Sequence, residues 1–337
     1  MTASSKDNAS QAPTGWGVYT LGNDPVLEWL EVLFRSFRRN NATLPLTVIP
    51  YTKSLSKLER MAKKYGFEIM DESECSRFDA LESVVMGYGK AAAMYRKWAC
   101  FFGRYSEFIY LDADIAVTSS LDVILDAFTA SPYDFVHFDL DVVSVYRPEA
   151  RAEMAAKYGS LGFNAGAFVS RKGIITYDEL IQFSRQAARD RNKFIIDQVD
   201  QPFLNYVMAS SGKRVGSIDK LVPAYAPCTF VVTPFTYDRK REEAICSDGR
   251  PMAFIHWPGC YYPTLMKPGI FLRYRTLGMP WLSRVGYYVL FYFRRYRAFF
   301  LKRKAHATKV LYQFFTSSAW RKFYLCKLVG VKIEMPS

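Results

Sequence analysis

Hydrophobic and polar positions alternate with two different periods along the chain from about Trp16 onward. Runs with the two-residue period of a strand are each followed by a segment with the 3.6-residue period of an amphipathic helix. The first four segments are a strand at 16–21, a helix at 25–39, a strand at 45–51 and a helix at 55–65. This order predicts crossover connections and an α/β fold with a mainly parallel sheet and flanking helices.

The later segments continue this alternation with more variation. We expect strands at 67–70, 108–111, 134–138 and 163–170, helices at 90–102, 121–128, 177–190 and 201–210, and an irregular stretch from 71 to 88. The stretch 223–262 is rich in proline, threonine and aromatic residues, which predicts edge strands and loops.

The loop after the first strand is a candidate ligand-binding loop. Asp24 suits a helix N-cap and Pro25 suits the first helical position, so the first helix should begin directly after Asn23. Ligands of α/β sheets bind at the carboxyl ends of the strands. The pattern therefore places Asn23 and Asp24 at the ligand-binding edge of the predicted sheet.

Two carboxylates, Asp112 and Asp114, end the buried strand at 108–111. Carboxylates this close repel each other and need water or a cation between them. Hard oxygen ligands suit a divalent cation that also binds a diphosphate, which favours transfer of a group from a nucleotide. A second Asp-x-Asp triplet, Asp139 and Asp141, is a secondary candidate. The alternative interpretation is that such carboxylates only cap turns in solvent.

The sequence signatures of three other classes of nucleotide-dependent protein are absent. The sequence has no Gly-x-Gly-x-x-Gly after the first strand and no Gly-x-x-x-x-Gly-Lys loop, which argues against dinucleotide-dependent oxidoreductases and P-loop hydrolases. The segment 21–25 also lacks the glycine-rich loop with arginine that is typical of sugar nucleotidyltransferases.

Further groups of residues occur in a distinctive order around the Asp112 strand. They are Tyr95, Arg96, Lys97 and Trp98 on a predicted helix; Phe163, Asn164, Ala165 and Gly166 on a predicted strand; Asp200, Gln201, Leu204 and Asn205 at a helix start; His256, Trp257, Pro258 and Gly259; and Lys267 with Pro268. Over about residues 16–268, this ordered set resembles the retaining glycosyltransferases of the GT-A fold, in particular the glycogenin-like family 8 group.

The resemblance implies a metal site and a donor site. Asp112, Asp114 and His256 would hold Mn²⁺ or Mg²⁺ on the donor diphosphate, with Asp112 also near the ribose. Because imidazole suits Mn²⁺ better than Mg²⁺, we expect manganese. Arg96 would approach the donor, and Lys267 would neutralise charge on the departing diphosphate. Lys267 departs from the family pattern, since it follows Gly259 at a longer interval and precedes Gly269.

The resemblance also assigns the sugar and acceptor side. Asn164, Asp200 and Gln201 would line the donor sugar and the acceptor face, with Gln201 stabilising an oxocarbenium-like transition state. A displaced pair, Asp197 and Gln198, could take the place of Asp200 and Gln201. Asn23 and Asp24 would meet the base or the ribose. The alternative for Asp200 is a helix cap, and for Arg96 it is a solvated helix face.

The chain is basic, with a net charge of +13, and the excess lies at one end. Residues 267–337 contain 15 lysines and arginines and the single acid Glu334, interleaved with many aromatic residues. Such a tail suits an anionic membrane surface, but also a solvated or protein-binding role or, as the weakest alternative, nucleic acid. On a helical wheel the basic residues from Arg294 to Lys304 do not form one face.

The composition and the first residues of the chain bear on its domain organisation and its cellular location. Half of the residues are hydrophobic, so the chain can bury a large core. We expect a disordered lead at 1–14, a GT-A catalytic domain at 15–268 and a basic, aromatic tail at 269–337. The start lacks a secretory pattern, no apolar run is long enough to cross a bilayer, and the six cysteines form no Cys-x-x-Cys pair. The expected location is cytoplasmic, with reduced thiols and peripheral membrane association.

Together these features predict a metal-dependent hexosyltransferase that moves a sugar, with retention, from a nucleotide sugar to a glycan or lipid-linked acceptor. The expected donor is a UDP-sugar. Two other hypotheses stay open: an inactive sugar-nucleotide-binding or scaffold protein of the same fold, and a nucleic-acid-binding protein that uses the basic tail. For an inverting enzyme, Asp139 or Asp141 would be candidates for the base.

Overall fold

A computed structural model describes residues 14–87, 93–159, 161–259 and 265–316 of the chain. It divides into two compact units: Met1–Pro258 with Gly269–Arg275 form the first, and Gly259–Pro268 with Thr276–Ser337 form the second. The predicted domain boundary at residue 268 stays a prediction.

The centre of the first unit is a mixed sheet, seven-stranded over the described residues, in the order β3-β2-β1-β4-β7-β6-β8. Its strands are β1 (Thr14–Gly22), β2 (Leu46–Pro50), β3 (Glu68–Ile69), β4 (Tyr105–Leu111), β6 (Phe135–His137), β7 (Ala167–Arg171) and β8 (Val215–Ser217). β7 runs antiparallel to β4 and β6, and the other neighbours are parallel. The predicted α/β class with a mainly parallel sheet is confirmed.

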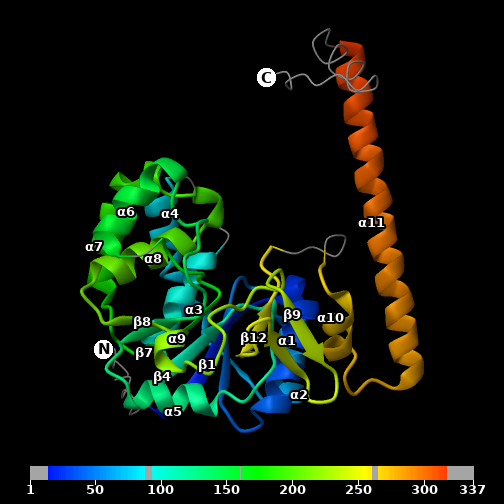
Figure 1. Ribbon diagram of the computed structural model, residues 1–337, viewed down its shortest axis with the longest axis horizontal. Helices are drawn as coiled ribbons and strands as arrows, with labels where there is room; N and C mark the ends of the chain where they lie inside the picture. The colour runs from blue at the N-terminus through cyan, green and yellow to red at the C-terminus, as the bar shows by residue number, and fades with distance from the viewer. Residues whose placement is uncertain (1–13, 88–92, 160, 260–264, 317–337) are drawn as a thin grey trace, which may run out of the picture. The chain divides into compact units, whose positions relative to one another are not determined.

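Alternate residues of the central strands enter two different hydrophobic cores. In β4, Phe108 and Tyr110 belong to one core, whereas Ile109 and Leu111 belong to the other. This follows from the two-residue period of a strand, and it requires helices on both faces of the sheet. The result is a three-layer α/β/α arrangement within the first unit (Figure 1).

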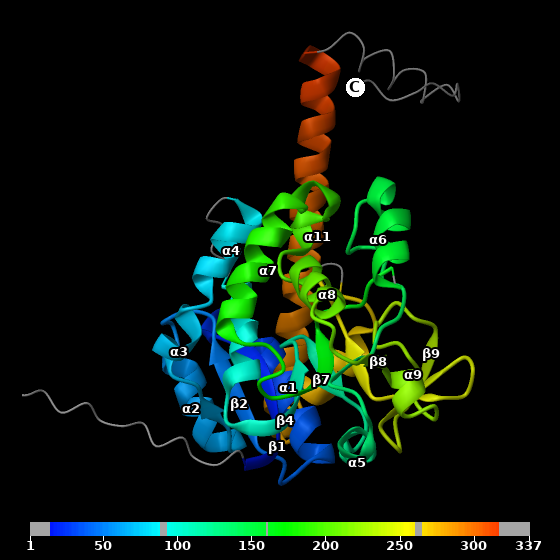
Figure 2. The same cartoon turned by 90° about the vertical axis from the view of Figure 1, so that its left-hand side faces the viewer.

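The helices divide between the two cores. The first core is covered by α3 (Glu72–Ser76), α4 (Asp79–Met86), the 3₁₀ helix η2 (Met94–Phe102), α6 (Arg151–Tyr158), α7 (Tyr177–Arg189) and α8 (Gln201–Ser210). The second is covered by α1 (Leu27–Asn40), α2 (Ser56–Tyr65), α5 (Asp122–Ala130) and α9 (Ile218–Leu221). Figures 1 and 2 show α4, α7 and α8 together, apart from α1 and α2.

Besides the main sheet, the described residues form two small sheets. β5 (Ile115–Val117) pairs antiparallel with β12 (Phe254–His256), and β9 (Phe235–Asp238), β10 (Glu243–Cys246) and β11 (Pro251–Met252) form a meander. The expectation of edge strands and loops in 223–262 is confirmed for the described residues. The β5–β12 pair brings the residues after β4 next to a segment from late in the chain.

The sequence predictions of individual elements were wrong in three places. The stretch 71–88 is not irregular, because α3 and α4 occupy most of it. The strand expected at 163–170 begins only at Ala167, so Phe163, Asn164, Ala165 and Gly166 lie on the preceding loop. The helix expected at 90–102 is a 3₁₀ helix from Met94; residues 88–92 lie outside the described residues.

The first helix also begins differently from the prediction. A short 3₁₀ turn, η1 (Asp24–Val26), precedes α1, and Asp24 makes no cap of its own helix. Its carboxylate instead accepts hydrogen bonds from the backbone N–H groups of Lys57 (3.1 Å) and Leu58 (2.9 Å), and so caps α2. These bonds lower the pKa of Asp24 against the opposing effect of burial. Asp24 therefore fixes the start of α2 to the loop after β1.

The second unit contains the long helix α11 (Trp281–Thr316). Within this unit the Arg295 guanidinium donates to the backbone carbonyl of Leu265 at 2.8 Å. No helix among the described residues is both long enough and apolar enough to cross a membrane.

Candidate metal and donor site

β1 and β4 are neighbours at the point where the strand order changes direction. From β1 the chain continues to β2 on one side, whereas β4 lies on the other side. Such a switch point leaves a crevice at the carboxyl ends of the two strands, where α/β proteins bind ligands. Asn23 follows β1 and Asp112 follows β4, so both residues lie at this edge.

The backbone fixes both carboxylates of the first Asp-x-Asp triplet. The Asp112 N–H donates to the Gly166 carbonyl at 2.7 Å, and the Asp114 carbonyl accepts from the Trp257 N–H at 3.0 Å. The first bond ties the triplet to the loop before β7, and the second ties it to the end of β12. Both aspartate side chains keep partial exposure, 30% for Asp112 and 26% for Asp114.

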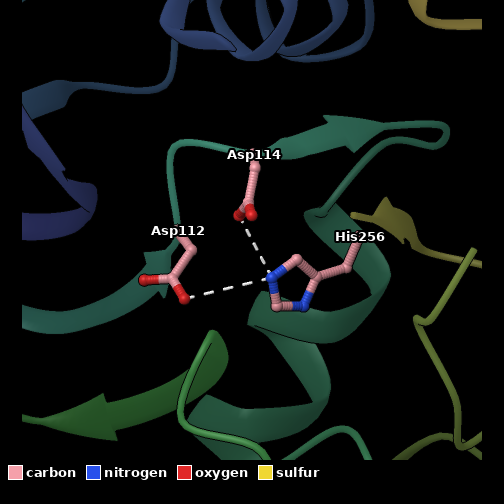
Figure 3. Close-up of side chains that lie close together, drawn as sticks. All are labelled: Asp112, Asp114 and His256. Atoms are coloured by element: carbon pink, nitrogen blue, oxygen red, sulfur yellow. Dashed lines mark ion pairs between the residues drawn. The ribbon is translucent and has the colours of Figure 1, made fainter. Parts of the chain in front are cut away.

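His256 completes a group of three potential metal ligands (Figure 3). Its Nε2 lies 3.1 Å from Asp114 Oδ1 and 4.0 Å from Asp112 Oδ2. One ligand atom from each residue lies within 4.8 Å of the others. A divalent ion with metal–ligand distances of about 2.0–2.2 Å has neighbouring ligand atoms about 3 Å apart. Asp114 and His256 already have this spacing, and Asp112 would have to move closer to join them on one ion.

The two oxygens of Asp112 have separate environments. Oδ1 accepts from the Tyr110 hydroxyl at 2.8 Å and lies 3.3 Å from the Lys97 ammonium, whereas Oδ2 faces His256. Hydrogen bonds of this kind orient a metal-ligating carboxylate. Asp112 is therefore held by one oxygen, and its other oxygen could bind a cation.

Gly166 is required beside this group. A Cβ at this position would lie 2.3 Å from His256 Cε1 and 2.7 Å from Asp112 Oδ2. Both distances are shorter than real carbon contacts allow, so any side chain would displace a ligand. Gly166 belongs to a segment that the resemblance singled out, but its close approach to the ligands could not be derived from the sequence.

The electrostatics of His256 also fit a cation site. The ring is almost fully buried and its Nδ1 has no hydrogen-bond partner among the described residues. Burial opposes protonation, but the carboxylates of Asp114 and Asp112 outweigh it and raise the pKa of the imidazole. Negative charge thus accumulates around His256 Nε2, which is the field that a divalent cation neutralises.

Lys97 is the buried cation of the site. Its ammonium lies 2.6 Å from Asp200 Oδ2 and donates to the Ala165 carbonyl at 2.9 Å, in addition to its contact with Asp112. Burial disfavours the charge, but the two carboxylates outweigh it and raise the pKa of Lys97. Lys97 therefore stays protonated and links the triplet to the start of α8.

Arg96 points elsewhere, although the resemblance assigns it to the donor. Its guanidinium makes a bidentate contact with Asp79 and further contacts with Glu72 and the Pro50 carbonyl. Successive residues of a 3₁₀ helix project about 120° apart, so Arg96 and Lys97 face different directions. The sequence motif contains Lys97, but a role at the site was predicted only for Arg96, because the sequence pattern did not predict a 3₁₀ helix. The donor role of Arg96 stays a prediction.

Asn164 and Gln201 form a buried chain of amides. Asn164 Nδ2 donates to Gln201 Oε1 at 2.9 Å, and Gln201 Nε2 donates to the Ser144 hydroxyl at 3.1 Å. Asn164 Oδ1 accepts from the Gly166 N–H at 2.7 Å, so the chain ends at the metal-ligand group. The structure brings these two predicted residues together, and their amides are engaged with one another.

Asp200 lies at the start of α8 and contacts Lys97, as described above. Its side chain is 14% exposed, and because Lys97 contacts Asp112 as well, the Asp200 carboxylate lies close to the triplet. Of the alternative pair, Asp197 is exposed on the 3₁₀ turn η5 (Ile196–Gln198), and the side chain of Gln198 lies outside the described residues. Asp200 is thus the carboxylate of the two that reaches the site.

Asn23 lies beside the site with an available acceptor. It is 9% exposed, its Nδ2 donates to the Thr52 hydroxyl at 3.4 Å, and its Oδ1 has no partner among the described residues. Nearby, burial and the charges of Asp112, Asp200 and Asp114 raise the pKa of Tyr51, whose hydroxyl donates to Met94 Sδ at 3.1 Å. Tyr51, the residue after β2, was not selected from the sequence, since no motif marks it.

Two other sequence candidates have different settings. Asp139 is buried and accepts from the Thr229 N–H at 2.7 Å, while Asp141 is exposed with a left-handed φ of 47°. The second triplet therefore stabilises a loop. Lys267 belongs to the second unit and has a φ of 46°, and its role stays a prediction.

Comparisons with known proteins bear on the fold. No protein-family model matches the sequence, and no curated protein sequence matches it. The apo structure of the bifunctional glycosyltransferase WbbM aligns with 81% of this chain at 13% identity and a TM-score of 0.51. This chain covers 51% of WbbM, about half its length.

Two further solved structures are similar at lower scores. The galactosyltransferase LgtC, in complex with donor and acceptor sugar analogues, aligns over 80% of this chain and 99% of its own at 16% identity and a TM-score of 0.48. Mouse xyloside xylosyltransferase 1 aligns over 60% and 84% at 11% identity and a TM-score of 0.43. The predicted GT-A fold resembling family 8 is confirmed by the likeness to WbbM, which at this identity shows the fold alone.

Proposed function

We propose that this protein is a metal-dependent glycosyltransferase that moves a sugar from a nucleotide sugar to a glycan or lipid-linked acceptor. The observation that carries the proposal is the convergence of Asp112, Asp114 and His256 at the switch point of the sheet. This edge suits a nucleotide, and the ligand set suits the cation that a nucleotide diphosphate requires.

The ion would be Mn²⁺, because one imidazole and two carboxylates match its ligand preferences. A cation held by these residues would neutralise the donor diphosphate and so favour its departure. Mg²⁺ is the alternative ion.

The chain's own residues would orient the donor around this group. Lys97 would hold Asp112 and Asp200 in place, and Asn23 would offer its unpartnered Oδ1 to the base or ribose. Asp200, Gln201 and Asn164 would border the donor sugar. Because the Gln201 amide is already bonded to Asn164 and Ser144, its role would be to shape the pocket or to exchange one of these bonds for the sugar.

The finer assignments rest on the resemblance to family 8. A UDP-sugar donor and retention of the anomeric configuration follow from it, as do the donor roles of Arg96 and Asp24 and the leaving-group role of Lys267. The bonds that Arg96 and Asp24 make within the protein favour structural roles for both. Lys97 is the better candidate for the cation at the donor.

Sugar-nucleotide binding without transfer is the second candidate function. The engaged Gln201 amide favours it, since the residue proposed at the anomeric carbon is occupied within the protein. Donor binding without donor hydrolysis or sugar transfer would establish this alternative. A nucleic-acid-binding role would instead show affinity that falls steeply with salt and survives mutation of Asp112.

Titration calorimetry with UDP and with GDP, each with Mn²⁺ and with EDTA, tests the proposal. We expect UDP to bind in the presence of Mn²⁺ and to lose affinity in EDTA. The matched control is Asp141→Asn, which changes the exposed aspartate of the second triplet and should bind UDP normally. Absence of binding for both nucleotides would exclude the transferase proposal.

The basic tail would bring the enzyme to an anionic membrane surface. Two of the ten exposed large apolar side chains described on α11, Leu290 and Leu301, lie apart from the rest. The other eight follow a spacing of about three to four residues, and at 100° per residue they fall within an arc of about 120°. They are Trp281, Leu282, Val285, Val289, Tyr292, Phe293, Tyr296 and Phe300. We call this set the α11 stripe.

The basic residues of the same stretch lie outside the α11 stripe. Arg284, Arg294 and Arg297 are exposed and project on other sides of the helix. An apolar stripe with aromatic residues, flanked by cations, is the arrangement of helices that lie in the membrane interface. The sequence-based wheel of basic residues missed this, because the order lies in the apolar positions. A peripheral location on the cytoplasmic membrane face follows from this proposal.

A further inference from the structure

The structure brings together two cysteines that the sequence shows as unrelated. Cys228 Sγ and Cys246 Sγ lie 3.4 Å apart. Cys228 is half-buried in the loop after α9, and Cys246 is buried at the end of β10. Cys75 and Cys100, the other cysteines of the described residues, are fully buried elsewhere in the first core.

Backbone hydrogen bonds hold the two thiols in this position. The N–H of Ala226, two residues before Cys228, donates to the Pro251 carbonyl at 2.9 Å. The N–H of Cys246 donates to the Arg250 carbonyl at 2.9 Å. The two cysteines are thus anchored to neighbouring residues of one turn. A disulfide has an S–S distance of about 2.05 Å, so a small side-chain movement would close the bond.

We propose that Cys228 and Cys246 form a reversible disulfide by exchange with a low-molecular-weight disulfide. The Cys228 thiolate attacks one sulfur of the reagent, which releases one thiol and leaves a mixed disulfide on Cys228. The Cys246 thiolate then attacks the Cys228 sulfur and releases the second thiol. Two protein thiols are oxidised, and the reagent disulfide is reduced to two thiols.

The exposure of the two thiols determines the order of these steps. Cys228 is the more accessible of the pair and so meets the reagent first. Burial raises the pKa of Cys228, and burial with the neighbouring Cys228 thiol raises that of Cys246 to about 12. Because the thiolate is the nucleophile, the exchange should be slow near neutral pH and faster in alkali.

The disulfide would affect a residue that contacts a candidate metal ligand. Thr229 follows Cys228; its N–H donates to Asp139, and its carbonyl accepts from the His256 N–H at 2.8 Å. A cross-link to β10 restricts the opening of this loop and so protects both amides. The inference concerns thiol pairing and stands apart from the proposed transferase function.

The test is redox equilibration of the full chain in glutathione buffers, followed by alkylation of remaining thiols, digestion and mass spectrometry. Trypsin does not cleave at Arg250 or Lys267, since proline follows each, so Cys246 and Cys260 share a peptide. The protein for this experiment therefore carries Cys260→Ser.

We expect a Cys228–Cys246 cross-linked peptide in oxidised buffer, with loss of both alkylatable thiols and recovery in reduced buffer. Cys75 and Cys100 serve as internal controls and should stay reduced. With Cys246→Ser added, Cys228 should instead keep glutathione as a stable mixed disulfide. Hydrogen exchange at the Thr229 and His256 amides should slow on oxidation, and only when both cysteines are present.

A stable glutathione adduct on Cys228 while Cys246 is present would overturn the proposal, because it would show that the second attack does not occur. So would full alkylation of both thiols after equilibration in oxidised buffer at alkaline pH. Both results are measured on protein that retains Cys228 and Cys246. The test of the proposal therefore does not depend on whether the Cys246→Ser variant folds.

Discussion

Asp114 and His256 are held together by backbone and side chain at once. The Trp257 N–H donates to the Asp114 carbonyl at 3.0 Å, and His256 Nε2 lies 3.1 Å from Asp114 Oδ1. The first bond continues the pairing of β5 with β12, so the geometry of the ligands is set by the sheet. A site built on strands in this way would be preorganised for a cation.

Asp114→Asn should abolish metal-dependent nucleotide binding. The amide keeps the shape of the side chain but removes its charge, and we expect Mn²⁺-dependent affinity for UDP to fall more than about 100-fold. Calorimetry with Mn²⁺ measures this directly. Asp141→Asn is the control, and equal losses in the two variants would contradict the assignment of the first triplet.

Gly166→Ala tests the space beside the ligands. The added Cβ would meet His256 Cε1 at 2.3 Å, so we expect Mn²⁺ affinity to fall by about 10–100-fold while the fold persists. Gly15→Ala is the control, since a Cβ there has no neighbour within 4 Å. Unchanged metal affinity in Gly166→Ala would show that the ion does not lie between these residues.

Lys97→Met should destabilise the protein. It would leave Asp112 and Asp200 without their buried cation, and loss of one partner of a buried pair costs about 3–5 kcal/mol of unfolding free energy. Chemical denaturation measures the change, with the exposed Lys63→Met as control. Adding Asp200→Asn should recover part of the loss; if it instead adds to it, the two residues are not coupled.

His137 should make stability depend on pH. Burial lowers its pKa from 6.5 to about 4, so the unfolded chain binds a proton that the folded chain refuses. Its contribution is complete above pH 6.5 and is lost as the pH falls toward about 4, by about 3 kcal/mol.

Denaturation of the natural sequence and of His137→Gln across this pH range isolates the effect. The difference between their unfolding free energies should change in favour of the variant as the pH falls. Parallel pH profiles would show that His137 titrates alike in the folded and unfolded states.

Phe293→Ser with Tyr296→Ser should weaken binding to vesicles that contain phosphatidylserine. Each aromatic side chain of the α11 stripe offers about 1.5–3 kcal/mol when buried in the membrane interface, so we expect at least about a tenfold loss. Sedimentation with the vesicles measures it. UDP binding should be retained.

Two comparisons make the vesicle experiment specific. Val123→Ser removes an exposed apolar side chain from α5 in the first unit and should leave vesicle binding unchanged. Vesicles of neutral phosphatidylcholine should bind more weakly than anionic ones, because the flanking arginines then have no partner charge. Equal binding of the natural chain and the double variant would exclude the α11 stripe as the docking surface.

The sequence by itself determined the features that depend on local order. The two periods of hydrophobic residues predicted β1, α2 and α8 closely, because burial of alternate residues on a strand or of one helix face leaves a direct pattern. The triplet at Asp112 and Asp114 was also visible, since its residues lie next to each other. The ordered motifs led to the GT-A fold and to His256.

Only the tertiary structure decided which side chains meet. Arg96 and Lys97 are neighbours in sequence, but the 3₁₀ helix turns one toward Asp79 and the other into the site. Asp24 caps α2 instead of its own helix because folding brings a more distant helix start to its carboxylate. The pairing of β5 with β12, the clearance at Gly166 and the contact between Cys228 and Cys246 depend on residues far apart in the chain, whose proximity no local pattern encodes.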